Sequence, residues 1–151
     1  MFLKLHGVTG EASDTEHKGE IDVVSWSWGM QANSSLATGQ ATARSTISEL
    51  QIVKRVDQSS PTLMNFLRTN KVVSQALLVV RKAGKTPLEY FRMELENVRV
   101  TSIKAESESA ELVERVNLGF SKVKVSYTPQ DSLGARGGGA NVFEADAHTG
   151  S

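Results

Sequence analysis

The sequence has no cysteine among its 151 residues. That absence excludes disulfide bonds, thiolate metal sites and catalysis by a thiol nucleophile. It also makes the chain indifferent to the redox state of its compartment. A chain of this length buries on the order of 70% of the surface that its unfolded form exposes, which is enough for one core and too little for two. We therefore expect one domain without covalent cross-links.

Net charge is also lacking, because 17 lysines and arginines balance 17 aspartates and glutamates. No net field would draw such a chain to nucleic acid or to an anionic membrane surface. The local basic cluster of Arg81, Lys82 and Lys85 is small and is typical of a turn. We expect any partner to be recognised by local shape and pairing, and we expect no nucleic-acid binding.

Long apolar runs are absent as well. No window approaches the ~18 apolar residues that a membrane-spanning helix needs. The N-terminal segment Met1–Gly7 has neither a basic stretch followed by an apolar run nor a small-residue cleavage site. We expect no membrane insertion and no signal peptide. The protein would begin in the cytoplasm and could leave it only by an unconventional route.

What the sequence does contain is a series of short runs rich in valine, isoleucine, aromatic residues and threonine, separated by polar and glycine-containing stretches. This pattern predicts a mainly β domain. The expected strands are Phe2–Leu5, Glu20–Met30, Ser45–Val56, Val72–Lys82, Leu88–Ile103 and Glu111–Tyr127, with a short one at Asn141–Phe143.

One segment predicts a helix. Ser60 is a good N-cap, Pro61 suits the first helical position, and Asn70 can end the helix. A helix of two to three turns is too short to be stable alone in water, so it must lie on the sheet. Its apolar face would consist of Leu63, Met64, Phe66 and Leu67.

Three of the expected strands change the phase of their apolar residues. The phase changes between Val23 and Val24, between Leu95 and Val98, and between Phe120 and Val123. Side chains alternate faces along a strand, so such a change needs a bulge or a passage between two buried environments. A bulge at a barrel corner is the favoured interpretation, and burial of the second face against a neighbouring subunit is the alternative.

The run from Ala76 to Val80 is apolar at every position, which predicts a strand covered on both faces, with the helix as one cover. Two other segments have little core-forming pattern. Gln31–Arg44 is rich in small polar residues, and a stretch of that length is either functional or disordered. Residues 132–151 contain three consecutive glycines and predict a short flexible tail without a domain of its own.

Catalytic motifs are not evident. No serine lies in a G-x-S-x-G turn, and His6, His17 and His148 have polar or glycine-containing neighbours and no partner at a meaningful spacing. The acids Glu106, Glu108, Glu111 and Glu114 fall between two strands and predict the solvated end of a hairpin. We expect no enzymatic activity. A hydrolase on a barrel would require a histidine beside a serine or a carboxylate.

Metal and cofactor motifs are not evident either. No two histidines have ligand spacing. The acids Asp14, Glu16, Glu20 and Asp22 lack the alternation and the central glycine of a calcium loop, so we expect a solvated polar loop there. The C-terminal glycines neither follow a strand nor open a helix, which argues against a phosphate site. We expect no metal and no cofactor.

Trp26 and Trp28 lie two residues apart on one face of an expected strand. Exposed, they would form a stacking platform for a sugar, and the chain would be a monomeric carbohydrate-binding β-sandwich. In a chain with few aromatic residues they are more typical of a core. We assign Trp26, Trp28, Leu63, Phe66 and Phe120 to the structural core.

The order of these pieces resembles the haemolysin-coregulated protein (Hcp) family. The resemblance covers about residues 1–131, which we take as the domain. It rests on the opening MFLKLHGVTGEA, on HKGEIDVVSWSWGM, on SSPTLMNFL, on LLVVRKAGKTPLEYFRMELENVRVTSI and on VNLGFSKVKVSYTPQD. The most specific pieces are the Trp-Ser-Trp-Gly strand, the helix start, the Val-Arg-Lys-Ala-Gly turn and the Tyr-Thr-Pro-Gln-Asp exit.

The resemblance implies a small β-barrel of two packed antiparallel sheets with one short helix on its side, assembled as a hexameric ring. In that family rings stack into the inner tube of a type VI secretion system, which is expelled from the cell. The implied partners are further copies of the chain, the spike protein, the sheath and baseplate, and small effector proteins in the lumen.

The resemblance also implies a site. The segment Gln31–Arg44 occupies the place of the family's extended loop, which reaches toward the next ring. The ring–ring contact residues implied by this position are Gln31, Ala32, Asn33, Ser34, Ser35, Leu36, Ala37, Thr38, Gly39 and Gln40.

Overall fold

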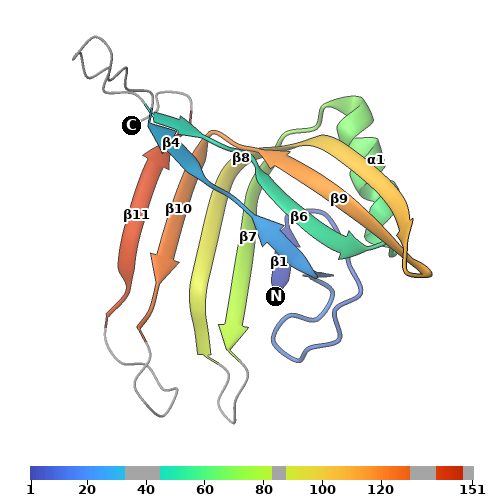
Figure 1. Cartoon of the computed structure of the whole chain (residues 1–151), viewed down its shortest axis with the longest axis horizontal. Coiled ribbons are helices and arrows are strands. Elements are labelled where there is room, and N and C mark those ends of the chain that lie inside the picture. The colour runs from blue at the N-terminus through green and yellow to red at the C-terminus, as the bar shows by residue number, and fades with distance from the viewer. Residues whose placement is uncertain (33–44, 83–87, 130–138, 148–151) are drawn as a thin grey trace.

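A computed structural model describes residues 1–32, 45–82, 88–129 and 139–147. These residues form one helix and eleven strands (Figure 1). In chain order the elements are β1 (Phe2–Leu5), β2 (Ile21–Asp22), β3 (Ser25–Ser27), β4 (Met30–Ala32), β5 (Ser45–Ile47), β6 (Leu50–Arg55), α1 (Ser59–Thr69), β7 (Val73–Lys82), β8 (Leu88–Glu108), β9 (Glu111–Gly119), β10 (Lys122–Tyr127) and β11 (Asn141–Asp146).

Nine strands form one antiparallel sheet that folds over on itself, and β4 and β5 form a separate two-stranded ladder. The central path runs β2-β1-β7-β8-β9-β6-β3, with β10 and β11 added beside the first part of β8. The 21 residues of β8 cross both halves of the sheet. Its first part pairs with β7 and β10, and its second part pairs with β9. The two halves enclose the core, as expected for a small barrel (Figure 1).

Two of the predicted phase changes turn out to be one corner. Asn97 has a φ of 53°, in the left-handed region that asparagine tolerates better than most residues. Across the ladder, the Ser121 amide donates to the Glu96 carbonyl at 2.9 Å, and the Asn97 side-chain amide donates to the Ser121 hydroxyl at 2.9 Å. β8 and the segment that runs from β9 into β10 therefore bend together, which reverses the buried face of both.

The third phase change lies where the two edges of the sheet meet and the barrel closes. The Val23 amide donates to the Met1 carbonyl at 2.9 Å, and the adjacent Val24 amide donates to the Val53 carbonyl at 2.8 Å. Consecutive residues thus bond to opposite edges of the sheet. The expected single strand Glu20–Met30 is for this reason divided into β2, β3 and β4. A barrel corner accounts for each of the three phase changes within the chain.

The helix begins two residues earlier than predicted. α1 starts at Ser59, and Asp57 rather than Ser60 provides the oxygen that accepts the Ser59 amide, at 2.8 Å. At the other end Asn70 adopts the left-handed conformation, with φ 54°, and its amide donates to the Leu67 carbonyl. Ser60 is free to face inward, where its hydroxyl joins a buried ion pair described below.

Buried aliphatic side chains from both halves of the sheet and from α1 make one core. Leu63 and Phe120 are buried in it, while Phe66 and the two tryptophans are partly buried and pack against it. Trp26 also stacks on Phe91, with ring centroids 5.1 Å apart. Tryptophans packed in this way do not form an exposed platform, so the carbohydrate-binding alternative has no support.

The cover over β7 differs from the prediction. α1 packs against β8 (Figure 1), so it is not what covers the outer face of β7. Phe2 of β1 is the register partner of the buried Val79 of β7. The Phe2 ring stacks on the His17 ring, with 4.5 Å between the ring centroids. The loop that carries His17 therefore supplies the second cover of this strand.

The C-terminal region contributes a strand longer than the expected Asn141–Phe143. β11 pairs with β10 over six residues, from Lys122 opposite Asp146 to Tyr127 opposite Asn141. Ala145 and Ala147 pack against the core. This part of the predicted tail thus belongs to the sheet. No helix in the described part of the chain combines the length and the apolar character that crossing a membrane requires.

Candidate functional site

The predicted ring–ring loop is described only at its base. Gln31 and Ala32 lie in β4, opposite Thr46 and Ser45 of β5. All three residues of β4 are exposed. Asn33–Gln40 lie outside the described residues. The β4–β5 ladder is the described base from which the intervening segment extends.

The open edge of the sheet offers a second surface. Among the described strands β11 pairs with β10 alone, so it is an edge strand of the described sheet. Val142 and Phe143 on this strand are 53% and 39% exposed. An edge strand with exposed apolar side chains is a surface on which another chain can pair.

A groove of 740 Å³ lies on one face of β1, β7, β8, β10 and β11. Its charges compensate one another. The Lys124 ammonium lies 4.0 Å from a Glu94 carboxylate oxygen and 3.7 Å from one of Glu144. The two carboxylates offset the positive charge of this lysine.

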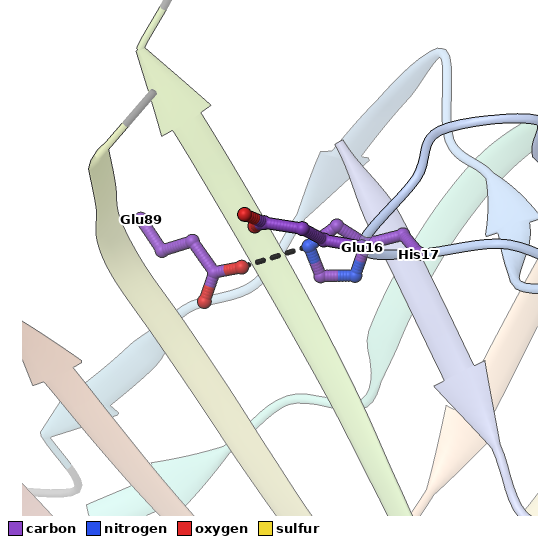
Figure 2. A group of neighbouring side chains, drawn as sticks. All are labelled: Glu16, His17 and Glu89. Carbon is purple, nitrogen blue, oxygen red and sulfur yellow. Dashed lines mark hydrogen bonds and ion pairs between the residues drawn. The ribbon is translucent and has the colours of Figure 1, made fainter. Parts of the chain in front are cut away.

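A polar cluster surrounds His17, whose side chain is buried. Figure 2 shows His17 with Glu16 and Glu89. The Nε2 atom of the imidazole lies 2.7 Å from Glu89 Oε1, and Nδ1 lies 3.0 Å from both carboxylate oxygens of Glu20. Both ring nitrogens therefore face carboxylates.

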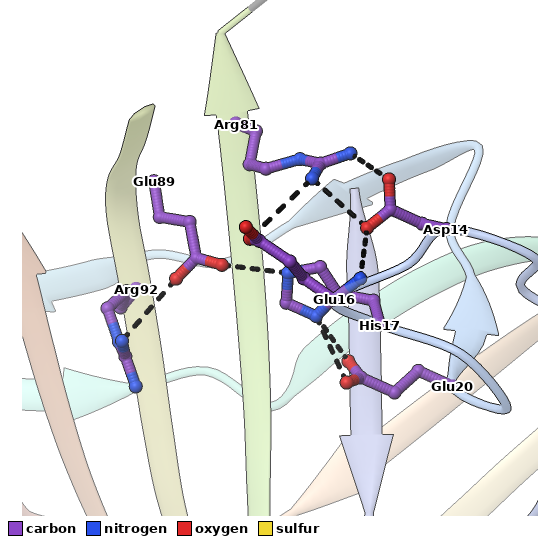
Figure 3. A network of polar contacts seen from close by, with 7 residues as sticks. All are labelled: Asp14, Glu16, His17, Glu20, Arg81, Glu89 and Arg92. Atoms are coloured by element: carbon purple, nitrogen blue, oxygen red, sulfur yellow. Dashed lines mark hydrogen bonds and ion pairs between the residues drawn. The ribbon is translucent and has the colours of Figure 1, made fainter. Parts of the chain in front are cut away.

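Further ion pairs extend this cluster (Figure 3). The Arg81 guanidinium donates to both oxygens of Asp14, at 2.6 and 3.1 Å, and Arg92 lies 3.4 Å from Glu89. The hydrogen bonds from Arg81 lower the pKa of the Asp14 carboxyl, and Asp14 in turn raises the pKa of Arg81. Arg81 also lies over the Phe2 ring, 5.0 Å from its centroid.

A second ion pair is completely buried inside the barrel. Lys54 of β6 and Glu114 of β9 are register partners with side chains fully removed from solvent, and the lysine ammonium bonds directly to Glu114 Oε1. The Ser60 hydroxyl of α1 donates to the same oxygen at 2.7 Å, and Asp57 lies 3.1 Å from the ammonium. Glu114 Oε2 has no hydrogen-bond partner among the described residues.

Burial would raise the pKa of the Asp57 carboxyl. The hydrogen bonds from Ser59 and Lys54 outweigh that effect, so the net shift of the Asp57 pKa is downward. The carboxylate form is therefore the one that the fold stabilises. This residue joins the start of the helix to the buried ion pair.

These clusters correct two predictions from the sequence. Asp14 and Glu20 are largely shielded and paired, so the segment is not a freely solvated loop. Glu114 is buried, although its neighbours Glu106, Glu108 and Glu111 do pair near the surface with Arg115 or Arg55. The three-residue spacing of His17 and Glu20 was a local signal for one contact. Glu89, 72 residues away, was not foreseeable from spacing.

Catalytic geometry is not evident in the described ranges. The buried imidazole of His17 faces carboxylates, and no serine hydroxyl is bonded to it. Glu106, Glu108 and Glu111 pair with arginines, and Glu114 pairs with Lys54. Ser109 and Ala110, both with positive φ, form the turn between β8 and β9.

Comparison with known proteins agrees with this architecture. The family model described as "Type VI secretion system effector, Hcp" matches residues 2–127. The chain is 38% identical to protein hcp1 of Pseudomonas aeruginosa over 144 residues, which are 92% of this chain and 89% of that protein.

Two solved structures are similar over nearly their whole length. Hcp1 of Salmonella typhimurium is 30% identical, with a TM-score of 0.82 over 99% of this chain and 95% of that one. A type VI secretion system effector from Yersinia pestis is 25% identical, with a TM-score of 0.79 over 96% and 98%. The chain therefore belongs to the Hcp family of type VI secretion system proteins.

Proposed function

We propose that this chain is the tube-forming subunit of a type VI secretion system. Six copies form a ring, and rings stack into a hollow tube that is expelled from the cell. The family membership established over residues 2–127 carries this proposal. A small barrel with open strand edges and without catalytic geometry in its described part is consistent with a structural role.

The lateral contact of the ring is assigned to the edge strand β11. A ring requires a heterologous interface, in which one surface of each subunit meets a different surface of its neighbour. The outer edge of β11, which faces no further described strand, and the exposed side chains of Val142 and Phe143 supply hydrogen-bonding and apolar groups for such a contact. β11 lies beyond residues 2–127, which the family model matches.

The axial contact is assigned to the Gln31–Arg44 segment, whose base is the β4–β5 ladder. Small polar residues make only weak individual contacts. A ring presents six copies of the segment at once, and multivalency converts weak contacts into stable stacking. Stacking of this kind can also be reversed when the tube comes apart.

The proposed tube implies further protein partners. We assign a spike protein at its end, a contracting sheath around it, a baseplate beneath it and small effector proteins within its lumen. The subunit would be cytoplasmic before firing and outside the producing cell, or inside a target cell, afterwards. We assign it no enzymatic activity, cofactor or nucleic acid.

The solution mass tests the ring directly. Size-exclusion chromatography with light scattering should give a mass near six times the subunit mass of 16.4 kDa. The Val142→Asp variant should shift the mass toward that of a monomer, because a charge in the lateral contact would be buried without a partner. A clean monomer of the unaltered chain across a wide concentration range would contradict autonomous ring formation.

A matched variant distinguishes the effect of a charge at the β11 edge from the effect of a charge elsewhere on the surface. Leu112 is 62% exposed on β9, away from β11, and Leu112→Asp should leave the mass unchanged. Loss of the hexamer in both variants, or in Leu112→Asp alone, would contradict the assignment of the lateral contact to β11.

A further inference from the structure

We propose that Glu16, His17 and Glu89 form a binding site for a divalent transition metal ion, with Zn²⁺ as the best fit. One ligand atom from each residue lies within 4.8 Å of the others (Figure 2). The site joins the loop before β2 to the start of β8. It lies apart from the β11 edge and the β4–β5 ladder, so it does not depend on the proposed function.

The ligand types fit this class of metal. An imidazole nitrogen with two carboxylate oxygens suits Zn²⁺, whose open position a water molecule can fill. Mg²⁺ instead prefers six oxygen ligands in a near-ideal octahedron, several of them water. The one nitrogen donor thus distinguishes the two ions.

Glu20 prepares the histidine for this role. Its carboxylate lies 3.0 Å from Nδ1, and a carboxylate on one ring nitrogen directs the lone pair of the other toward a metal. That other nitrogen, Nε2, faces Glu89. The Phe2 ring stacked on the imidazole further fixes the plane of the ring.

The distance between two of the ligand atoms suits a shared metal ion. Nε2 and Glu89 Oε1 lie 2.7 Å apart. A metal ion held by both would separate these two atoms slightly. Glu16, whose side chain is 68% exposed, can turn toward the same point as the third ligand.

The charge around the site favours a cation. Four carboxylates, those of Asp14, Glu16, Glu20 and Glu89, outnumber the two guanidinium groups of Arg81 and Arg92 by two (Figure 3). A divalent ion would balance this excess. Arg81 lies 4.0 Å from Glu16 and opposes a cation there, but its charge is already offset by the bidentate bond to Asp14.

Calorimetric titration of Zn²⁺ into the full chain at pH 7.5 tests the proposal. We expect one ion per chain, and no comparable binding of Mg²⁺. His17→Gln and Glu89→Gln should each weaken the affinity at least ~10-fold, and Glu20→Gln should weaken it about 10- to 100-fold through the orientation of the imidazole. Circular dichroism would verify that each variant is folded.

A histidine-depleted variant is the matched control. The chain has three histidines, so His6→Gln combined with His148→Gln leaves His17 as the remaining one. This double variant should bind Zn²⁺ with the affinity of the unaltered chain. An affinity that is unchanged in His17→Gln but lost in the double variant, or no saturable binding up to about 1 mM Zn²⁺, would overturn the proposal.

A structural readout is independent of the affinity. Bound metal would tie the loop to β8, so hydrogen exchange of the loop amides around residues 12–20 should slow on addition of Zn²⁺. The same amides should not respond in Glu89→Gln. Protection that persists in that variant would contradict the bridging arrangement.

Discussion

At the scale of single residues, the buried pair of Lys54 and Glu114 has the largest energetic consequence. Both side chains are fully removed from solvent, and one oxygen of Glu114 has no hydrogen-bond partner among the described residues. Burying two charges costs several kcal/mol per ion, and their attraction offsets this cost only while both partners are present. The pair is therefore sensitive to the loss of either member.

Replacing Glu114 by alanine should lower the free energy of unfolding by about 3–5 kcal/mol, because it leaves a buried ammonium without its main partner. The double change Lys54→Met with Glu114→Leu should cost far less, since it removes both charges and keeps the volume. Urea unfolding at one fixed protein concentration measures both values.

An exposed pair provides the control. Arg55 and Glu111 lie 3.6 Å apart on the same two strands, with side chains 63% and 59% exposed. Glu111→Ala should change the free energy of unfolding by only about 0–1 kcal/mol. A similar loss for Glu111→Ala and Glu114→Ala would contradict the assigned role of burial.

At the scale of elements, α1 depends on Asp57 for its start. Its carboxylate accepts the Ser59 amide and hydroxyl and lies 3.1 Å from the Lys54 ammonium. The first turn of a helix has amides without partners inside the helix, and a carboxylate there satisfies one of them. Asp57 thus fixes both the first residue of the helix and its attachment to β6.

Replacing Asp57 by alanine should lower the free energy of unfolding by about 1–2 kcal/mol at pH 7. The fold lowers the pKa of Asp57, so its contribution is complete above the ordinary aspartate pKa of about 3.9 and is lost as pH falls through the lower folded value. The difference between the two proteins should be constant from pH 5 to 8 and shrink below about pH 4. Urea unfolding across this range measures it.

The exposed Asp22 on β2 is a suitable control for the pH series. Asp22→Ala should leave the stability nearly unchanged throughout. A difference between the unaltered chain and Asp57→Ala that stayed constant down to pH 3 would show that the charge of Asp57 contributes nothing.

At the scale of the whole molecule, ring formation and ring stacking are assigned to separate parts of the chain. The proposed lateral contact lies at β11, whereas the proposed axial contact extends from the β4–β5 ladder. The ladder is not part of the nine-stranded sheet. Changes at the ladder should therefore leave the barrel intact.

Deleting residues Ala32–Ala43 should preserve hexamers and abolish both tubes and secretion, because only the axial contact is lost. Light scattering reports the ring, electron microscopy reports the tube, and culture supernatants report secretion. Deleting Gly137–Gly139 is a control that shortens another small-residue segment and should leave stacking unchanged. Monomers after the loop deletion would contradict its axial role.

Sequence patterns located most of the local structure, but not the start of the helix or the division of Glu20–Met30 into three strands. Alternating apolar residues identified the strands, and Asn70 marked the end of the helix. The phase changes also indicated corners, because alternation along a strand cannot reverse without one. What they could not indicate is that Asn97 and Ser121 occupy the same corner, or that Val23 and Val24 bond to opposite edges.

The sequence by itself thus determined the β architecture, its one helix and, through its motifs, the family. The tertiary structure alone decided which charges are buried and which partners meet. In the sequence Glu114 cannot be told from its exposed neighbours, and it is buried because β6 and α1 enclose it. His17 contacts Glu89 because β7 pairs with β8 beneath the loop. Local periodicity reports which way a side chain points, whereas burial and pairing depend on what the rest of the chain places opposite it.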